Sequence, residues 1–167
     1  MSNLRRYFKN ADICFITNVT FQRKPILIEN IDLLRQSIDN VKKKSTFNLI
    51  AWVILPDHFH FILDPKENDP TKILQRIKMS FGVLYRVKLN IRSGRIWQNR
   101  FWDHIIRNQN DLNLHVDYIH FNPVKHGYVT KASDWEHSSI LDYINMGVYQ
   151  KDWEIIKPQD LEGDFGE

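Results

Sequence analysis

Residues 51–63 read AWVILPDHFHFIL, and they predict the hairpin at the centre of the fold. The run from Phe47 to Leu55 is apolar except for Asn48 and is bounded by turn signals, so it predicts a strand. Pro56-Asp57 predicts a tight turn, after which His58 to Leu63 returns as the second strand of a hairpin. The centre of the fold is therefore expected to be an antiparallel pair of strands.

The alternation within the returning strand separates two kinds of side chain. On a strand, residues two apart project to the same face. His58 and His60 therefore point together. The opposite face is apolar and is expected to lie in a core; it carries Phe59, Phe61 and Leu63.

Outward from this hairpin, the sequence pattern predicts two further strands and three helices. The two strands are Asp12–Phe21 and Ile96–Ile106. The first helix is Glu29–Lys44, and the second starts at Pro70, with Asp69 as its N-cap. The third helix is Asp111–Phe121, which is expected to end at Asn122-Pro123. The order β-α-β-β-α-β with an added helix is the split βαβ arrangement. We therefore predict a ferredoxin-like α+β fold with a central antiparallel sheet and an additional C-terminal helix that carries Tyr118.

Length and composition limit the class of protein. The chain has 167 residues, 43% of them hydrophobic, with 6 Gly, 6 Pro and a single cysteine, Cys14. These values exclude a disulfide framework, a multi-cysteine zinc site and collagenous architecture. The longest apolar run, 49–55, is far shorter than the ~20 residues of a membrane span. We expect one domain over residues 1–150, an acidic C-terminal tail over residues 151–167, and a cytoplasmic protein without a membrane segment.

The net charge of +3 conceals an uneven distribution. Residues 151–167 hold two lysines and six acids, whereas residues 70–102 hold eight basic residues, interleaved with aromatic ones, and no acid. Basic side chains neutralise phosphates and aromatic rings stack on unpaired bases, so this segment predicts nucleic-acid binding. The alternative is a solvated helix face followed by an arginine-rich loop. The candidate DNA-binding residues are Lys72, Arg76, Lys78, Arg86, Arg92, Arg95, Arg100 and Lys125.

Four residues carry the candidate chemistry. Two imidazoles at the spacing of His58 and His60 can share one divalent cation. Tyr118 and Asn122 are four residues apart, so on a helix they lie on one face. The Asn122 amide oxygen is then a candidate third ligand, and Tyr118 a candidate nucleophile toward a metal-polarised phosphate. Without the histidines, the same two residues would be interpreted as a core tyrosine and a helix-ending asparagine.

Five stretches together resemble a known family. They are FITNVTFQR from Phe15, AWVILPDHFHFIL from Ala51, IWQNRFWDH from Ile96, YIHFNPVKHG from Tyr118 and WEHSS from Trp135. In this order they resemble the single-tyrosine HUH transposases of insertion sequences, most closely the branch of REP-associated tyrosine transposases. The resemblance spans roughly residues 15–140. Leu55 stands where the family usually has Met, a conservative apolar exchange.

The resemblance implies a single HUH transposase-like catalytic domain within residues 1–150. In it Tyr118 is the nucleophile, and His58, His60 and Asn122 hold Mg²⁺ or Mn²⁺. The implied substrate is single-stranded DNA folded into hairpins, such as REP-like palindromes. The implied reaction is DNA transposition by strand transfer, in which a 5′-phosphotyrosine link forms and a 3′-hydroxyl reverses it. Monomer and homodimer both remain open.

Two alternatives from other classes also remain open. One is a catalytically silent, ferredoxin-like nucleic-acid-binding protein, and the other is a metal-dependent nuclease that activates water. Asp57 and Asp64 are interpreted as turn and strand-end residues, with support of the histidine pair as the alternative. Four further histidines are interpreted as structural: His104, His115, His120 and His126. His115 is also a candidate for proton transfer.

Overall fold

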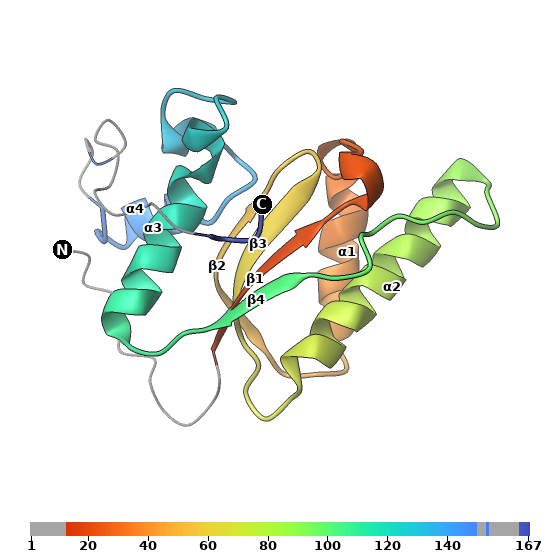
Figure 1. Ribbon diagram of the computed structural model, residues 1–167, viewed down its shortest axis with the longest axis horizontal. Helices are drawn as coiled ribbons and strands as arrows, with labels where there is room; N and C mark the ends of the chain where they lie inside the picture. The colour runs from red at the N-terminus through yellow and green to blue at the C-terminus, as the bar shows by residue number, and fades with distance from the viewer. Residues whose placement is uncertain (1–12, 150–152, 154–163) are drawn as a thin grey trace.

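A four-stranded antiparallel sheet forms the centre of the protein (Figure 1). The computed structural model describes residues 13–149, 153 and 164–167. The strands lie in the order β2-β3-β1-β4, and their bounds are β1 Cys14–Val19, β2 Asn48–Ile54, β3 His58–Asp64 and β4 Trp102–Ile105. Every neighbouring pair is antiparallel. This order confirms the ferredoxin-like α+β prediction.

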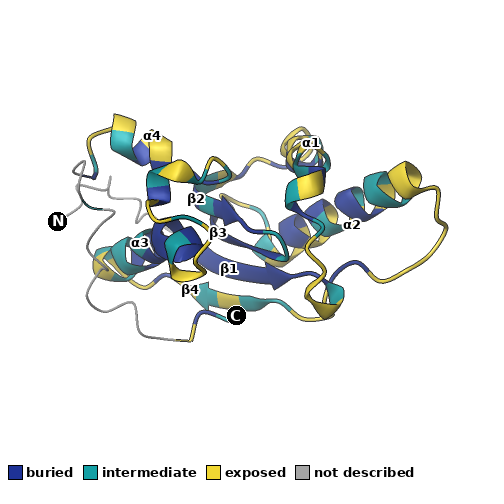
Figure 2. Cartoon of the chain, turned by 90° about the horizontal axis from the view of Figure 1, so that it is seen from above, coloured by how far each residue is buried: buried dark blue, intermediate teal, exposed yellow. Residues whose placement is uncertain are grey.

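The hairpin of β2 and β3 has the predicted turn. The backbone N–H of Leu55 donates to the carbonyl of His58 at 2.8 Å, which leaves Pro56-Asp57 as a two-residue loop. Ile54 pairs with Phe59 in the adjoining ladder. Figure 2 shows β1 and β3 buried along their whole length. Both faces of β3 are therefore covered, each by a different set of helices.

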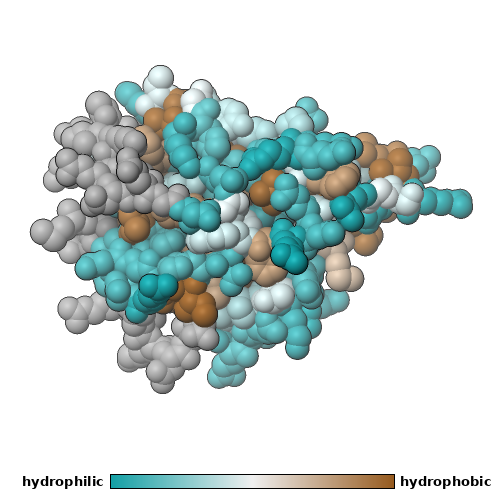
Figure 3. Space-filling model, viewed as in Figure 1, coloured by the Kyte–Doolittle hydropathy of each residue, from teal (hydrophilic) through white to brown (hydrophobic). Residues whose placement is uncertain are grey.

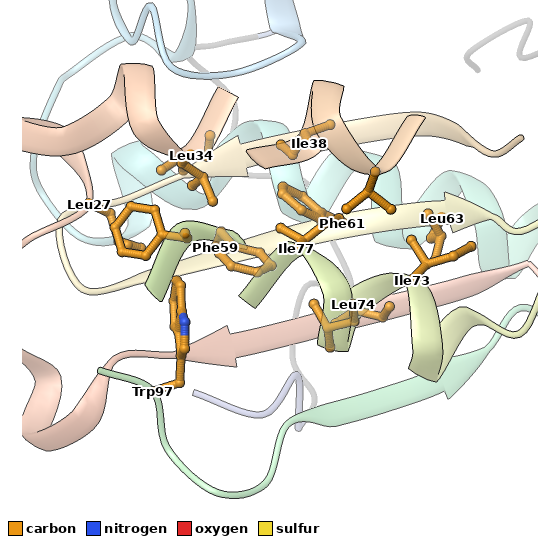
Figure 4. Close-up of a cluster of buried hydrophobic side chains, with 14 of the residues drawn as sticks. Leu27, Leu34, Ile38, Phe59, Phe61, Leu63, Ile73, Leu74, Ile77 and Trp97 are labelled. Atoms are coloured by element: carbon orange, nitrogen blue, oxygen red, sulfur yellow. The ribbon is translucent and has the colours of Figure 1, made fainter. Parts of the chain in front are cut away.

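Helices α1 (Ile31–Lys42) and α2 (Pro70–Leu89) pack against each other and cover one face of the sheet (Figure 1). The predicted N-cap is confirmed, because Asp69 accepts hydrogen bonds from the backbone N–H groups of Thr71 and Lys72 at 2.9 and 3.4 Å. Figure 4 shows the apolar core on this face, to which both helices and β3 contribute: Leu27, Leu34, Ile38, Phe59, Phe61, Leu63, Ile73, Leu74, Ile77 and Trp97.

Helices α3 (Gln109–Lys125) and α4 (Ile140–Asn145) lie on the other face (Figure 1). The predicted end of this helix at Asn122-Pro123 is wrong, because α3 continues to Lys125 with Pro123 inside it. A proline removes one backbone donor, but in the last turn the carbonyls of Asn122 and Pro123 still accept from the N–H groups of His126 and Tyr128, both at 3.0 Å. Asn122 thus keeps the helical position that places it with Tyr118.

The predicted strand over Ile96–Ile106 is also shorter than expected, since β4 covers only four residues. Near its expected start, Trp97 forms an isolated bridge with Thr20. The Trp97 ring turns into the core, where its indole N–H donates to the carbonyl of Lys78 at 3.1 Å. Packing of the Trp97 ring in the core therefore interrupts the strand between the Thr20–Trp97 bridge and the start of β4.

The surface carries polar side chains over most of the face drawn in Figure 3, with small separate apolar patches. Within the part of the chain that the structure describes, no helix combines the length and apolar character needed to cross a membrane.

Candidate active site

The four residues that carry the predicted chemistry come together between β3 and α3 (elements labelled in Figure 1). His58 and His60 project from β3, and Tyr118 and Asn122 project from α3. The ring centroids of His60 and Tyr118 are 5.4 Å apart. None of the four residues is more than 1% exposed. One chain therefore supplies the whole predicted group.

Asp57 fixes the direction of the His58 ring. Its Oδ1 accepts a hydrogen bond from Nδ1 of His58 at 2.7 Å, and its Oδ2 accepts one from Arg23 at 3.0 Å. Burial by itself would raise the pKa of Asp57, but the bonds from His58 and Arg23 outweigh it and lower that pKa. Asp57 is thus a turn residue and a support of His58 at once.

Thr17 fixes the direction of the His60 ring. Its Oγ1 lies 2.8 Å from Nδ1 of His60, and its hydroxyl donates to the carbonyl of Phe165. Since one hydroxyl has one proton to give, the imidazole Nδ1–H is the donor toward Thr17. Nε2 is then the basic nitrogen of His60, and burial lowers the pKa of this ring to about 4.

Two buried polar atoms at this point lack a hydrogen-bond partner among the described residues. They are Nε2 of His58 and Oδ1 of Asn122. An unpaired buried polar atom costs about 1–3 kcal/mol, so such atoms indicate a missing partner. Imidazole nitrogen and amide oxygen are both ligands for divalent cations. The residues present therefore fit the predicted metal.

Glu167, which the sequence analysis did not single out, lies in the middle of this group. Its Oε1 accepts hydrogen bonds from the Tyr118 hydroxyl and from Nδ2 of Asn122, the latter at 2.6 Å. The same oxygen lies 3.1 Å from Nε2 of His60 and 3.9 Å from Nε2 of His58. The carboxylate thus contacts the predicted nucleophile and all three predicted metal ligands.

The other oxygen of Glu167 faces a lysine and a histidine. Oε2 lies 2.7 Å from Nζ of Lys125 and 3.2 Å from Nε2 of His126. Burial opposes ionisation of Glu167, but hydrogen bonds from His126, Lys125 and Tyr118 outweigh it and hold its pKa far below the usual range. Burial and the contact with this carboxylate both raise the pKa of Tyr118. In this state the phenol is neutral beside a fixed negative charge.

Residues 164–167 lie along the site in an ordered path, drawn in dark blue in Figure 1. The ring of Phe165 stacks on Tyr118 with centroids 3.7 Å apart and an interplanar angle of 13°. Gly166 has φ +77° and passes so close to Trp102 that an added Cβ would lie 2.3 Å from the Cβ of that tryptophan. Except for Trp153, the rest of the predicted acidic tail, 151–163, lies outside the described residues.

The predicted DNA-binding residues fall into two groups. Lys125 lies in the site, 3.1 Å from the Tyr118 hydroxyl. The others lie on α2 and in the segment after it: Lys72, Arg76, Lys78, Arg86, Arg92, Arg95 and Arg100. Three of these line a groove of about 350 Å³ beside Trp97: Lys78, Arg86 and Arg95. The basic segment therefore forms a surface separate from the histidine group.

Of the four histidines interpreted as structural, three make contacts away from the Tyr118 hydroxyl. His120 contacts Tyr149 and Ser139 at 2.8 Å each, and burial lowers its pKa to about 3. Two others contact one carboxylate, that of Asp111: His104 and His115. The exception is His126, which contacts Glu167 inside the site.

Comparison with known proteins assigns the chain to a family. Residues 11–122 match the family described as "Transposase IS200 like". The chain belongs to the IS200-like transposases. This transposase is 39% identical over 156 residues to the REP-associated tyrosine transposase of Escherichia coli (strain K12), a match that covers 92% of this chain and 91% of the relative. A relative from Haemophilus influenzae is 34% identical over 176 residues, covering 99% of this chain and 100% of the relative.

A solved structure extends this likeness to three dimensions. A REP-associated tyrosine transposase bound to a REP hairpin matches this transposase with a TM-score of 0.78 and 35% identity. The match covers 100% of this chain and 98% of that chain. The transposase identified here is thus an enzyme that acts on DNA, with the fold predicted from its sequence.

Proposed function

We propose that this transposase cleaves and rejoins single-stranded DNA beside hairpins, with Tyr118 as the nucleophile. The observation that carries the proposal is the convergence of Tyr118, Asn122, His58 and His60 on one carboxylate oxygen. A point reached by a nucleophile and three potential metal ligands is where a scissile phosphate would have to bind.

The metal in this proposal is Mg²⁺ or Mn²⁺, held by His58, His60 and Asn122. Support comes from the unpaired Nε2 of His58 and Oδ1 of Asn122, and from the two bonds that fix the imidazole directions. A bound divalent ion would polarise the phosphate and orient it for attack. Asp57 and Thr17 are positioning residues in this scheme, because each acts through a ligand.

The proposed covalent step is the one that the family resemblance implies. The Tyr118 oxygen attacks the phosphorus and loses its proton, while the bond from phosphorus to the 3′ oxygen breaks and that oxygen takes up a proton. The products are a 5′-phosphotyrosine link and a free 3′-hydroxyl. Attack by a 3′-hydroxyl on the link restores the DNA backbone and the phenol, so the bond energy is conserved without ATP.

The DNA partner in this proposal is a hairpin with an unpaired flank, such as a REP-like palindrome. The solved relative is described as bound to a REP hairpin, and the basic surface of α2 offers phosphate contacts here. Catalysis takes place in the cytoplasm and within one chain, whether the protein is a monomer or a homodimer. The one-chain site rests on the packing of α3 against its own sheet.

A denaturing gel tests the proposal. End-labelled single-stranded hairpins from the flanks of the gene are incubated with the protein and Mn²⁺, Mg²⁺ or EDTA, and Tyr118→Phe is compared with the unaltered chain. We expect a metal-dependent covalent protein–DNA band that is absent with Tyr118→Phe. Cleavage that persists in the variant without such a band would instead identify a water-using nuclease. Binding without either product would identify a silent DNA-binding protein.

A further inference from the structure

The contacts of Glu167 define a binding site for an anion next to the nucleophile. One oxygen faces Tyr118, Asn122 and the histidines of β3. The other faces Lys125 and His126. A carboxylate and a phosphodiester both present two acceptor oxygens that share one negative charge, so donors arranged for one can also bind the other.

Lys125 is placed to act on the nucleophile as well as on the anion. Its Nζ lies 2.7 Å from Oε2 of Glu167 and 3.1 Å from the Tyr118 hydroxyl, and 4.9 Å from the centre of the Tyr118 ring. A cation at this point favours negative charge on the phenolic oxygen and on an attacked phosphate alike. The side chain is 43% exposed, so it is reachable by a DNA strand.

His126 lies beside Lys125 on this side of the site. It follows Lys125 directly after the helix end and presents Nε2 to the same carboxylate oxygen at 3.2 Å. Its ring lies 5.2 Å from that of His58, centre to centre. Among the described acids, only Glu167 forms an ion pair with either Lys125 or His126. Lys125 and His126 therefore both lie beside the position proposed for the scissile phosphate.

We propose that Lys125 and His126 are catalytic residues that bind one non-bridging oxygen of the scissile phosphate, at the position that the Glu167 carboxylate takes in this structure. The inference rests on the proposed role of Tyr118 as nucleophile. It goes further by giving these two residues direct contact with the reacting group. Glu167 and the phosphate then compete for one set of donors.

The experiment separates binding of the phosphate from binding of Glu167. Formation of the covalent complex is followed in single turnovers with saturating hairpin DNA and Mn²⁺, in a Glu167→Ala background that removes the competing carboxylate. Lys125→Met and His126→Gln are added singly, and Lys43→Met, on an exposed helix end, is the matched control. Hairpin affinity is measured in parallel without metal.

Glu167→Ala alone is expected to raise the rate at sub-saturating DNA. In that background, Lys125→Met should lower the saturated rate by about 100-fold or more, as loss of one donor to a developing charge does. His126→Gln should lower it by about 3- to 10-fold. Lys43→Met should leave it unchanged. Relative to the Glu167→Ala chain, hairpin affinity should change by less than about 3-fold in the three added variants, because the contact concerns one phosphate.

Other outcomes would overturn the inference. If Lys125→Met and His126→Gln leave the rate of the Glu167→Ala chain unchanged, the two residues bind Glu167 alone. If Glu167→Ala itself loses activity, the carboxylate is a ligand of the metal instead of an occupant of the phosphate site. If that chain forms no Tyr118-dependent adduct on any flanking hairpin, the proposed function fails before the inference is reached.

A stereochemical measurement distinguishes direct contact from a structural effect. The scissile phosphate is replaced by each phosphorothioate diastereomer in turn, which exchanges one non-bridging oxygen for sulfur. In the Glu167→Ala chain, the diastereomer with sulfur at the oxygen bound by Lys125 should react more slowly than unmodified DNA. Lys125→Met should abolish that difference for this diastereomer only. An equal rate loss with both diastereomers in Lys125→Met would contradict direct contact.

Discussion

The two faces of β3 differ in the chemistry that they bury. Toward α1 and α2 the strand presents Phe59 and Phe61, which join a core of aliphatic and aromatic side chains. Toward α3 it presents His58 and His60, which are equally buried but among polar groups. One face thus gains stability from apolar area, whereas the other depends on whether each polar atom has a partner.

Substitutions on the two faces should therefore affect different properties of the protein. On the apolar face, a truncation removes packing and leaves a cavity, so folding is affected first. On the polar face, a truncation removes a ligand or its support, so the reaction is affected first. Adjacent residues on one strand should therefore give opposite phenotypes.

The largest effect is expected from His60→Ala on the polar face. Loss of a ligand should reduce covalent-complex formation by more than about 1000-fold, since even loss of a group behind a ligand typically costs 10- to 100-fold. The measurement is the single-turnover rate with Mn²⁺. His104→Ala is the control, because that ring contacts Asp111 instead. Substantial activity in His60→Ala would show that the two faces do not differ in this way.

Phe61→Ala tests the neighbouring residue on the apolar face. Phe61 is 1% exposed, and its removal should lower the free energy of unfolding by about 3–5 kcal/mol. At low temperature, the rate of the folded fraction should stay within about 2-fold of the unaltered chain. Urea denaturation measures the first value, with the exposed Leu141→Ala as the matched control. A large rate loss in folded Phe61→Ala would mean that the core face also shapes the reaction.

Asp57→Asn should have an intermediate effect, because it retains a turn-forming residue but removes the anionic acceptor of His58. We expect metal affinity to fall by about 10- to 100-fold. Titration with Mn²⁺ measures it. Asp64→Asn is the control at the far end of β3, where the carboxylate contacts Lys66 at 2.6 Å. Equal losses in both variants would assign the effect to charge alone.

The smallest effect concerns His120, whose ring is buried with Tyr149 and Ser139. Burial lowers its folded pKa from 6.5 to about 3, so below pH 6.5 the unfolded chain takes up a proton that the folded chain does not. Its contribution to stability is complete above pH 6.5 and declines as the pH falls toward 3. We expect about 1 kcal/mol less stability at pH 5.5 than at pH 7 from this group. Urea titrations at both pH values measure the difference, which His120→Gln should reduce; an unchanged difference would contradict this role.

Local sequence patterns were sufficient for the order of the elements and for two pairings, His58 with His60 and Tyr118 with Asn122. That the two pairs form one site was implied by the family resemblance. Strand alternation and helix periodicity are short-range properties, so they can be read from neighbouring residues. The extent of β4 and the passage of α3 through Pro123 depended on tertiary contacts: the burial of Trp97 and the hydrogen bonds after the proline. Propensity alone does not contain those contacts.

The rest of the site came from long-range pairing. Thr17 meets His60 only because β1 and β3 are in register, and Glu167 reaches Tyr118 across 49 positions of the chain. Asp57 precedes His58 directly in the sequence, so a role in supporting the His58 ring was one interpretation. The favoured interpretation was that Asp57 forms the turn. Lys125 was selected for its charge, whereas its place beside the nucleophile required the fold.

The packing of α3 on its own sheet has a genetic consequence. A chain with Tyr118→Phe keeps its histidines, and a chain with His60→Ala keeps its tyrosine, but neither holds a complete set. Because the proposed site is assembled within a single polypeptide, two such defective alleles in one cell should fail to complement each other. The product of each gene copy is then active or inactive according to its own sequence alone.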